Sequence, residues 1–495
     1  MKTNNIATIL SFIIISIVAV NCGESPTIKV GVGETTITPE DPSGIYMSGF
    51  DRGGNTSTGV HDDLHTRSMV VEGKEGNTVA MLSVSVIGIS ESIQDDIREG
   101  IVEQTQIPSD NILISATHTH SGPSLSDRNE GYVQHLVKRS IQSAVQAWNN
   151  RVPGKIGVGT TEIIGLGKKR AALGHGGVHP DPEVGIIKIE NASDELMGVF
   201  YNYGAHPATL NLHNLQLSED WPHFSSQGIK DDIGNEVVVG LFQGASGDIN
   251  TGYTAELSAV GAYMYGARSF EYAKSKGHIL SDAVLEILPS IDTSGDMVVK
   301  TTNDRINFPR RTTYPYTHEE ALQWQEEARA NLEKMKNLVA AYPTTAKEAK
   351  NWKVKARDLG NQGQLDTENQ IGPRTFDQYK VELWLAEQAV RRAKAIEELP
   401  EDPDPIQMPV QSFRIGDAVF VAFPNEVYSE IGLAVKNQSP YDNTFIFSMS
   451  GGRGYIPTAA EYLEGGYVAN GSPFAPAAEQ VLINASLELI GNIDN

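Results

Sequence analysis

Two histidines, His118 and His120, are the residues best suited to chemistry in this 495-residue chain. They follow the apolar, β-prone run Ile112–Ile114 and precede the breaker Ser121-Gly122-Pro123. Residues i and i+2 of a strand point to the same face, so we expect both imidazoles to face one space at the carboxyl end of a strand. Imidazole is the commonest protein ligand of zinc and a general acid or base near neutral pH. The pair predicts either a ligand beside a proton shuttle or two inert histidines that cap a strand.

Four further segments place reactive side chains beside predicted strand ends. The turn 240–250 is rich in glycine, but it lacks the Gly-Lys-Ser/Thr of a phosphate loop and the Gly-x-Ser-x-Gly of a nucleophile elbow. Each segment can also be explained without any chemical role. Glu426, for example, is equally consistent with a carboxylate at a helix N-terminus, where negative charge is favourable. The segments are His206 after the run Gly198–Tyr203, the turn Gly240–Asn250, Glu426 after the run Ala418–Phe423, and the loop Gly451–Pro457, which contains Tyr455.

The spacing of apolar residues predicts the elements that position these side chains. Short β-like runs alternate with glycine-rich turns and amphipathic helices, which favours an α/β fold of mixed β-sheets with flanking helices. The expected strands are Thr78–Val86, Asn111–Ala116, Val184–Glu190, Gly198–Tyr203 and Val237–Phe242, and the expected helices are Asp95–Glu103, Tyr132–Trp148, Glu426–Lys436 and Ala475–Ile490.

Residues 317–405 differ from the rest and predict an inserted helical hairpin with a linker. Thr317-His-Glu-Glu320 is a capping-box pattern that starts one helix, Tyr342-Pro343 ends it, and Asp377–Glu398 has the spacing of a second. We therefore expect the α/β region to come in two parts, 22–316 and 406–495, on either side of the hairpin.

The net charge of the chain argues against strongly anionic partners. The chain has 39 Lys and Arg residues against 62 Asp and Glu, a formal net charge of −23. Nucleic-acid affinity comes largely from basic side chains on phosphates, and docking on anionic lipid needs them too. We expect no nucleic-acid partner, and the sequence leaves the oligomeric state open.

The first residues read as a targeting segment. Lys2 is followed by a mostly apolar stretch, Ile6–Val20, which is short for a membrane span. Cys22 is the only cysteine of the chain and is placed like the lipidation cysteine of bacterial lipoproteins. We expect residues 1–21 to be a lipoprotein signal peptide. The protein would then be exported and anchored through lipidated Cys22 in the bacterial cell envelope, in the periplasm or at the cell surface.

Several blocks together resemble the N-terminal catalytic domain of the neutral/alkaline non-lysosomal ceramidases, in the form of short bacterial members without the C-terminal β-sandwich. The resemblance spans roughly residues 28–490. Its blocks are Val30–Pro39, Val60–Arg67, Ala116–Pro123, His206, Gly247–Asn250, Pro424–Glu426 and Gly454–Pro457.

The resemblance implies a catalytic Zn²⁺ held by His118, His206, Glu426 and Tyr455. It places His120 beside the metal, where we expect this histidine to act as general base and acid, and Arg170 at the position of an active-site arginine. Where ceramidases have a serine implicated in catalysis, this chain has Asn250. An asparagine amide can still donate to a developing oxyanion, as can Arg170 or the backbone N–H groups of Gly244–Gly247.

These implications predict a zinc-dependent hydrolase of an N-acyl amide in a lipid-like or other extracellular substrate. Two alternatives stay open: a zinc-dependent esterase or amidase acting on a glycan, and a non-catalytic surface binding protein with a vestigial site. An apolar rim would indicate an acyl chain, and aromatic platforms with polar rims a sugar. Asp220 and Asp248 are candidates for orienting the histidines, and Trp221, Tyr253, Tyr316 and Tyr467 are candidate platforms.

Overall fold

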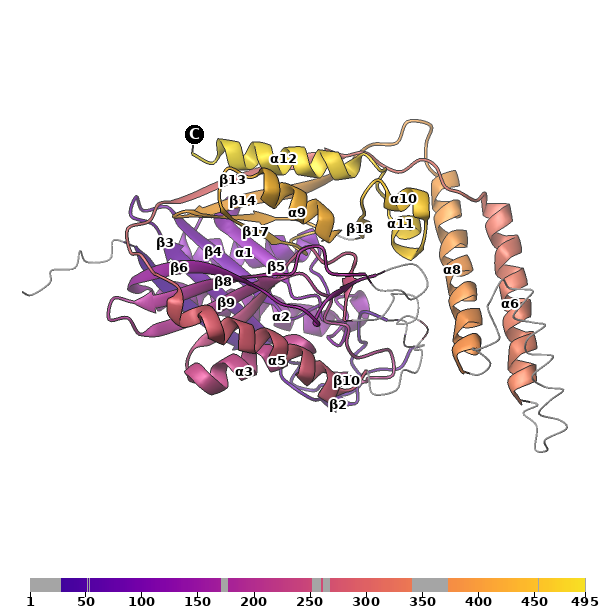
Figure 1. The fold of residues 1–495 in the computed structure, drawn as a ribbon, viewed down its shortest axis with the longest axis horizontal. Coiled ribbons are helices and arrows are strands. Elements are labelled where there is room, and N and C mark those ends of the chain that lie inside the picture. Colours follow the sequence, from indigo (N-terminus) through magenta and orange to yellow (C-terminus); the bar gives the residue numbers. More distant parts are fainter. Residues whose placement is uncertain are drawn as a thin grey trace, which may run out of the picture.

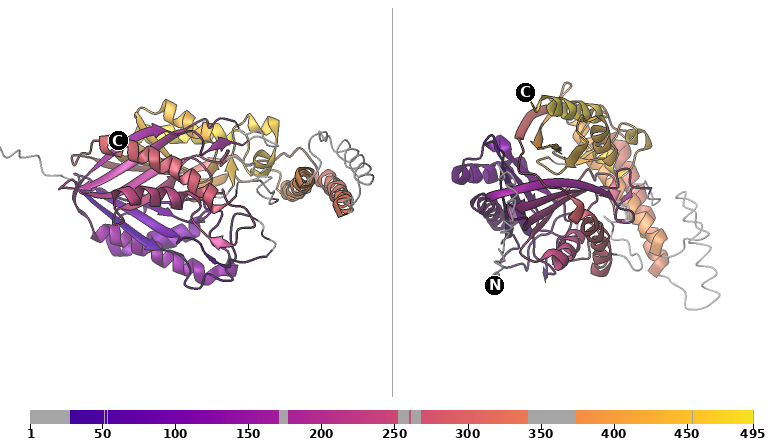
Figure 2. Two further views of the ribbon diagram at one scale, coloured as in Figure 1. Left: turned by 60° about the horizontal axis from the view of Figure 1, so that its bottom comes forward. Right: turned by 60° about the vertical axis from the view of Figure 1, so that its left-hand side comes forward.

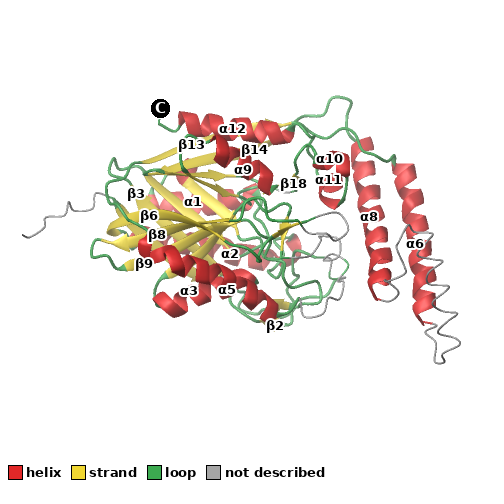
Figure 3. Cartoon of the chain, viewed as in Figure 1, coloured by secondary structure: helices red, strands yellow, loops and turns green. Residues whose placement is uncertain are grey.

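Two β-sheets lie face to face, and helices cover the outer face of each (Figures 1 and 2). The computed structural model describes residues 28–50, 52, 54–170, 177–251, 260, 268–340, 373–452 and 454–494. The fold is the mixed α/β class expected from the alternation of apolar runs and amphipathic helices, with strands and helices interleaved along the chain (Figure 3).

The larger sheet has eight strands in the order β11-β9-β8-β6-β1-β3-β4-β5. Neighbours are antiparallel except for the parallel pairs β4–β5 and β9–β11. The strands are β1 Lys29–Thr36, β3 His65–Glu72, β4 Thr78–Val84, β5 Ile112–Ala116, β6 Val152–Glu162, β8 Glu183–Asn191, β9 Leu196–Tyr203 and β11 Val238–Gln243. Each expected strand is present, within about two residues of its predicted ends.

The smaller sheet has four strands in the order β13-β14-β15-β17, from both sides of the inserted hairpin. Successive side chains of β15 point to opposite faces of the sheet, as in any β-strand. Phe420 packs inward against the larger sheet, and Val419 and Val421 pack outward beneath helices. Phe242 stacks on Phe447 across the two sheets, with ring centroids 4.4 Å apart. The strands are β13 Val299–Phe308, β14 Ile406–Ile415, β15 Ala418–Ala422 and β17 Asn443–Phe447.

Three helix pairs close the outer faces. Ile97 of α1 and Leu136 of α2 lie over β4 and β5, and Trp221 of α3 and Leu280 of α5 lie over β9 and β11. Leu482 of α12 covers the smaller sheet together with α9. The helices are α1 Glu91–Thr105, α2 Glu130–Asn149, α3 Trp221–Ile233, α5 Phe270–Ile287, α9 Ser429–Gln438 and α12 Ala478–Asn492.

Short strand pairs tie together the loops at one end of the sheets. Three pairs form in this way: β2 (Gly59–Val60) with β10 (Gln216–Leu217), β7 (Lys168–Lys169) with β12 (Ile249–Asn250), and β16 (Glu426–Val427) with β18 (Tyr455–Ile456). The last pair corrects one expectation. Glu426 lies in a strand and not in the first turn of a helix, because α9 begins only at Ser429.

Two long helices, α6 (His318–Ala340) and α8 (Pro373–Glu397), pack on each other and stand beside the main body (Figure 1). The expected capping box starts α6: the backbone N–H of Glu320 donates to Thr317 Oγ1 at 3.2 Å, and that of Thr317 donates to Glu320 Oε2 at 2.8 Å. The predicted stop at residues 342–343 lies outside the described residues. Two short helices, α10 (Glu461–Glu464) and α11 (Tyr467–Gly471), lie between α8 and the sheets.

The expected signal peptide and Cys22 also lie outside the described residues. Within the described part of the chain, no helix combines the length and the apolar character that a membrane crossing requires.

Candidate active site

The site is built where five strands end. β5, β9, β11, β15 and β17 each run into a loop that carries one of the candidate side chains. Side-chain hydrogen bonds hold these ends together. Asn202 Nδ2 donates to Phe242 O at 2.9 Å and to Ile446 O at 2.8 Å, and Ser115 Oγ donates to Ser448 O at 2.8 Å. Segments far apart in the sequence therefore meet at one fixed place.

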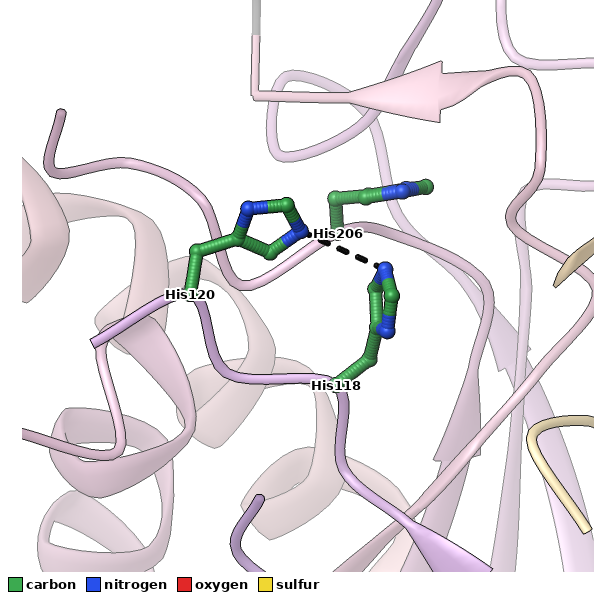
Figure 4. Close-up of side chains that lie close together, drawn as sticks. All are labelled: His118, His120 and His206. Carbon is green, nitrogen blue, oxygen red and sulfur yellow. Dashed lines mark hydrogen bonds between the residues drawn. The ribbon is translucent and has the colours of Figure 1, made fainter. Parts of the chain in front are cut away.

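Three imidazoles converge there: His118, His120 and His206 (Figure 4). One ring nitrogen from each lies within 4.8 Å of the others. The Nε2 atoms of His118 and His120 are 3.3 Å apart, and the rings of His118 and His206 meet edge to face with centroids 4.6 Å apart. Such a cluster matches the donor spacing of a metal site.

The two neighbouring histidines converge for a different reason from the one expected. Strand β5 ends at Ala116, so neither His118 nor His120 lies on a strand. His118 has φ +70°, in the left-handed region, and this turn brings the next imidazole back toward it. Backbone strain of this kind is common at functional sites and needs support from its surroundings. Support comes from His120 N, which donates to Pro207 O at 3.0 Å.

Backbone carbonyls orient two of the imidazoles. Nδ1 of His118 lies 2.6 Å from Ile87 O, and Nδ1 of His206 lies 2.9 Å from Ile249 O. A carbonyl only accepts, so each Nδ1 carries a proton, and in a neutral ring Nε2 then presents a lone pair.

The expectation that Asp220 and Asp248 orient the histidines is wrong. Asp220 accepts from the backbone N–H of Trp221 and of Leu210, at 2.7 and 3.1 Å. Asp248 accepts from the backbone N–H and the hydroxyl of Ser429, at 2.7 and 2.9 Å. Both carboxylates fix the starts of helices behind the site.

Glu426 completes the centre. Its Oε2 lies 3.1 Å from His206 Nε2 and 3.3 Å from His118 Nε2. Strand pairing sets Glu426 directly opposite Tyr455, so the register of β16 and β18 delivers a carboxylate and a phenol to one point.

Burial sets the protonation states. Burial, with help from Arg170 and His118, lowers the pKa of His206 to about 3, and burial with the other two imidazoles holds the pKa of His120 well below its usual value. For Glu426, burial opposes ionisation, but His118 and His206 outweigh it and keep the carboxyl pKa well below its usual range. Burial and then Glu426 raise the pKa of Tyr455 well above its usual value. The lowered pKa values of His120 and His206 favour neutral rings for these two histidines near neutral pH, beside an ionised Glu426 carboxylate.

This arrangement fits a cation. Nε2 of His206 and of His118 lie 3.1 and 3.3 Å from Glu426 Oε2, and because each Nδ1 lies against a backbone carbonyl, the neutral rings would present Nε2 lone pairs to the carboxylate. Such a group of acceptors is repulsive without positive charge between them. Imidazole nitrogens favour zinc over calcium or magnesium, which prefer oxygen ligands throughout.

Arg170 and Asn250 lie beside the cluster and line the same cavity. The Arg170 guanidinium lies 5.9 Å from the centroid of the Tyr455 ring. Burial disfavours its charge, but Tyr455 and Glu426 outweigh this and raise the pKa of Arg170. Asn250 Oδ1 accepts from Thr251 N at 2.9 Å, and among the described residues the Nδ2 group of this amide has no recorded acceptor, so it is the donor that faces the cavity chemistry.

The turn Gly244–Gly247 offers fewer free backbone N–H groups for an oxyanion than we expected from the sequence. The N–H of Gly244 donates to Tyr203 O at 3.0 Å and that of Gly247 donates to Val427 O at 2.8 Å, so neither is available to an oxyanion. Gly247 has another role: a Cβ there would lie 2.7 Å from Glu426 O. The glycine lets the strand that carries Glu426 approach closely.

A cavity of about 290 Å³ opens beside the three histidines. Sequence reasoning predicted one of its platform residues, Tyr467, and missed the wall from the inserted hairpin. Of the other predicted platforms, Trp221 is fully buried, Tyr316 lies near the start of α6, and Tyr253 is outside the described residues. The lining residues are Gly49, Phe50, His120, Arg170, His206, Ala208, Asn250, Trp384, Glu387, Gln388, Arg391, Tyr455 and Tyr467.

A second cluster contains side chains that could bind a metal, but its protein contacts account for it. Its members are Asp62, Glu219 and His223. Glu219 accepts from both Nη atoms of Arg67, at 2.8 and 3.2 Å, and from Ser85 Oγ at 2.6 Å. Asp62 accepts from Ser218 Oγ at 2.6 Å and from Glu219 N at 2.7 Å. These carboxylates already have protein donors and the Arg67 charge, so they form a buried ion-pair network.

Comparison with known proteins shows what this chain and its fold are similar to. Residues 28–254 match the family described as neutral/alkaline non-lysosomal ceramidase, N-terminal. The neutral ceramidase of Drosophila pseudoobscura is 26% identical over 236 residues, 40% of this chain and 32% of that protein. The neutral ceramidase of Drosophila melanogaster is 25% identical over 250 residues, 44% of this chain and 34% of that protein. The matched part spans about a third of the length of these curated relatives.

Among solved structures, the neutral ceramidase of Pseudomonas aeruginosa superposes with a TM-score of 0.67 at 17% identity, over 94% of this chain and 74% of that one. This likeness establishes the fold. The matches confirm the resemblance found in the sequence: residues 28–254 are similar to the N-terminal part of the neutral/alkaline non-lysosomal ceramidases.

Proposed function

We propose that this protein is a zinc-dependent hydrolase that cleaves the amide bond of an N-acyl substrate. The observation that carries the proposal is the close approach of His118 Nε2 and His206 Nε2 to Glu426 Oε2, at 3.3 and 3.1 Å. With Tyr455, these residues would hold the metal. Bound zinc supplies Lewis acidity, which makes a water acidic enough to act as a nucleophile near neutral pH.

The chain's own residues would carry the rest of the reaction. His120 is neutral, so its Nε2 is able to accept the proton of the attacking water and return it to the leaving nitrogen as the C–N bond breaks. General acid–base transfer of this kind contributes roughly 10² to 10⁴ in rate. Arg170 and the Nδ2 group of Asn250 would donate to the carbonyl oxygen as negative charge develops on it. The products are a carboxylic acid and an amine.

Asn250 takes the place of the serine that the resemblance leads one to expect. Its amide is held by its own backbone neighbour and cannot serve as a nucleophile, so the reaction proposed here uses no covalent intermediate. Water attacks directly, and Asn250 is assigned to oxyanion stabilisation alone.

The test is the release of octanoate from N-octanoyl amides by the purified, zinc-replete chain. We expect hydrolysis that a chelator abolishes and added zinc restores, with a loss of roughly 10² to 10⁴ in kcat in the His120→Ala variant. A zinc-replete, folded protein that releases no acid from any N-octanoyl amide would turn the assignment toward a binding protein.

We also propose that the protein is exported and held at a membrane of the cell envelope through lipidated Cys22. The proposal rests on the basic and apolar start of the chain and on the position of this cysteine. Wild type should fractionate with membranes, and Cys22→Ser should appear in the soluble fraction; an unchanged membrane fraction for the variant would contradict lipid anchoring.

A further inference from the structure

One wall of the cavity comes from the inserted hairpin. Trp384, Glu387, Gln388 and Arg391 of α8 all line the cavity beside His120 and His206. Their spacing of three, four and seven residues puts them on one stripe of the helix. A helix far from the catalytic loops in sequence therefore contributes a continuous face to the site.

This wall is fixed relative to the reacting groups. The Trp384 ring packs on Tyr467 with centroids 4.6 Å apart, and Tyr467 packs edge to face on Tyr455 with centroids 6.0 Å apart. On the adjacent side of α8, Arg392 donates to the backbone carbonyl of Gly471 in α11. A substrate held by the hairpin would thus be held at a set position with respect to Tyr455.

The polar groups of the wall are free to bind a ligand. Glu387 and Gln388 are half-buried and Arg391 is exposed. None of the three side chains has a hydrogen bond or ion pair with another residue in the part of the chain that the structure describes. Glu387 and Arg391 lie one turn apart with opposite charges that balance, so the wall offers acceptors, donors and an amide without favouring an anion or a cation.

The apolar part of the cavity is aromatic. Phe50, Trp384, Tyr455 and Tyr467 supply rings, and no Leu, Ile, Val or Met is among the described residues that line it. A long acyl chain is best matched by flexible aliphatic walls. A hydroxyl-bearing ring is better matched by aromatic faces with carboxylate, amide and guanidinium groups at their edges.

We infer that the amine part of the substrate is an amino sugar, recognised by the α8 wall of Trp384, Glu387, Gln388 and Arg391. The inference rests on the proposed N-acyl hydrolysis and names its substrate class. In the reaction, water adds to the acyl carbon, the bond from that carbon to the sugar nitrogen breaks, and the amino sugar leaves with the proton delivered by His120.

The test compares N-octanoylglucosamine with N-octanoylsphingosine, which share one acyl chain. We expect the zinc-loaded enzyme to prefer the sugar amide in kcat/KM. Glu387→Gln and Arg391→Gln should each raise its KM about tenfold or more, because each removes a hydrogen bond to a charged group, with little change in kcat. Matched controls are Glu398→Gln, in the turn directly after α8, and Lys394→Gln, on α8 itself; their side chains are 65% and 58% exposed and do not line the cavity. They should leave both constants unchanged.

Binding provides a readout apart from turnover. In the zinc-loaded His120→Ala background, calorimetry should show that N-octanoylglucosamine binds and that Glu387→Gln weakens it about tenfold. Preference for the sphingosine amide, or α8 variants that behave like the two controls, would overturn the inference while leaving N-acyl hydrolysis intact. If neither amide is hydrolysed, the proposed function fails, and this binding measurement still decides whether the wall recognises the sugar.

Discussion

Replacing Gly49 by alanine should disable proton transfer while leaving the metal ligands in place. Gly49 has φ +94°, and a Cβ there would lie 2.7 to 2.8 Å from Cα, Cβ and Cγ of His120. Carbon contacts settle near 3.5 to 4.0 Å, so the imidazole must move by roughly 1 Å. A displacement of that size costs about 10²-fold in rate, and the backbone conformation costs about 1 to 3 kcal/mol of stability.

Gly44→Ala is the matched control. Gly44 also has positive φ, +80°, but nothing lies within 4 Å of its Cβ position, so its variant carries the backbone strain without the collision. The assays are zinc content, thermal stability and kcat for an N-octanoyl amide. We expect both variants to keep zinc and lose similar stability, with the fall in kcat confined to Gly49→Ala. Equal activity in the two variants would refute the assignment of proton transfer to His120.

Three further outcomes follow from the structure. Gly247→Ala should weaken zinc about 10- to 100-fold in a chelator competition, because its Cβ would press on the backbone of Glu426; unchanged affinity would contradict the close approach. Arg170→Gln should lower kcat about 10²- to 10³-fold with zinc content unchanged, and loss of zinc instead would make its role structural. Burial raises the pKa of Asp220 from 3.8 to about 6, so the folded state holds a proton that the unfolded chain releases. As the pH rises from 4 to 7, the free energy of unfolding of wild type should therefore fall by up to about 3 kcal/mol relative to that of Asp220→Asn, since one pKa unit corresponds to about 1.36 kcal/mol. Denaturant unfolding of both proteins across this pH range measures the difference, and a free-energy difference that does not change with pH would contradict this expectation.

Much of the fold could be predicted from local patterns, because the apolar residues of buried strands and amphipathic helices recur at characteristic spacings along the sequence. The expected strand Gly198–Tyr203 and helix Tyr132–Trp148 appear as β9 and α2 with small shifts at their ends. The exact ends of the elements depend on tertiary contacts, which local sequence patterns do not contain. Strand β5 ends at Ala116, and the positive φ of His118 in the following turn could not be predicted from the residue types there.

The family resemblance grouped His118, His206, Glu426 and Tyr455 as candidate metal ligands, and in the structure these residues lie close together. The contacts that position them could not be predicted from the sequence. Sequence reasoning assigned histidine orientation to aspartates, whereas backbone carbonyls do this work, and carbonyls are present at every position of a chain. The α8 wall was also missed, because Glu387 and Arg391 have ordinary helix-surface spacing until tertiary packing turns them toward the cavity.

The most direct test of the central claim is the zinc content of the purified chain for wild type, Glu426→Ala and His223→Ala, each after zinc reconstitution and with its fold checked. We expect about one zinc per chain in wild type and in His223→Ala, whose residue belongs to the second, ion-paired group, and none in Glu426→Ala. Zinc that survives in Glu426→Ala or disappears in His223→Ala would contradict that claim.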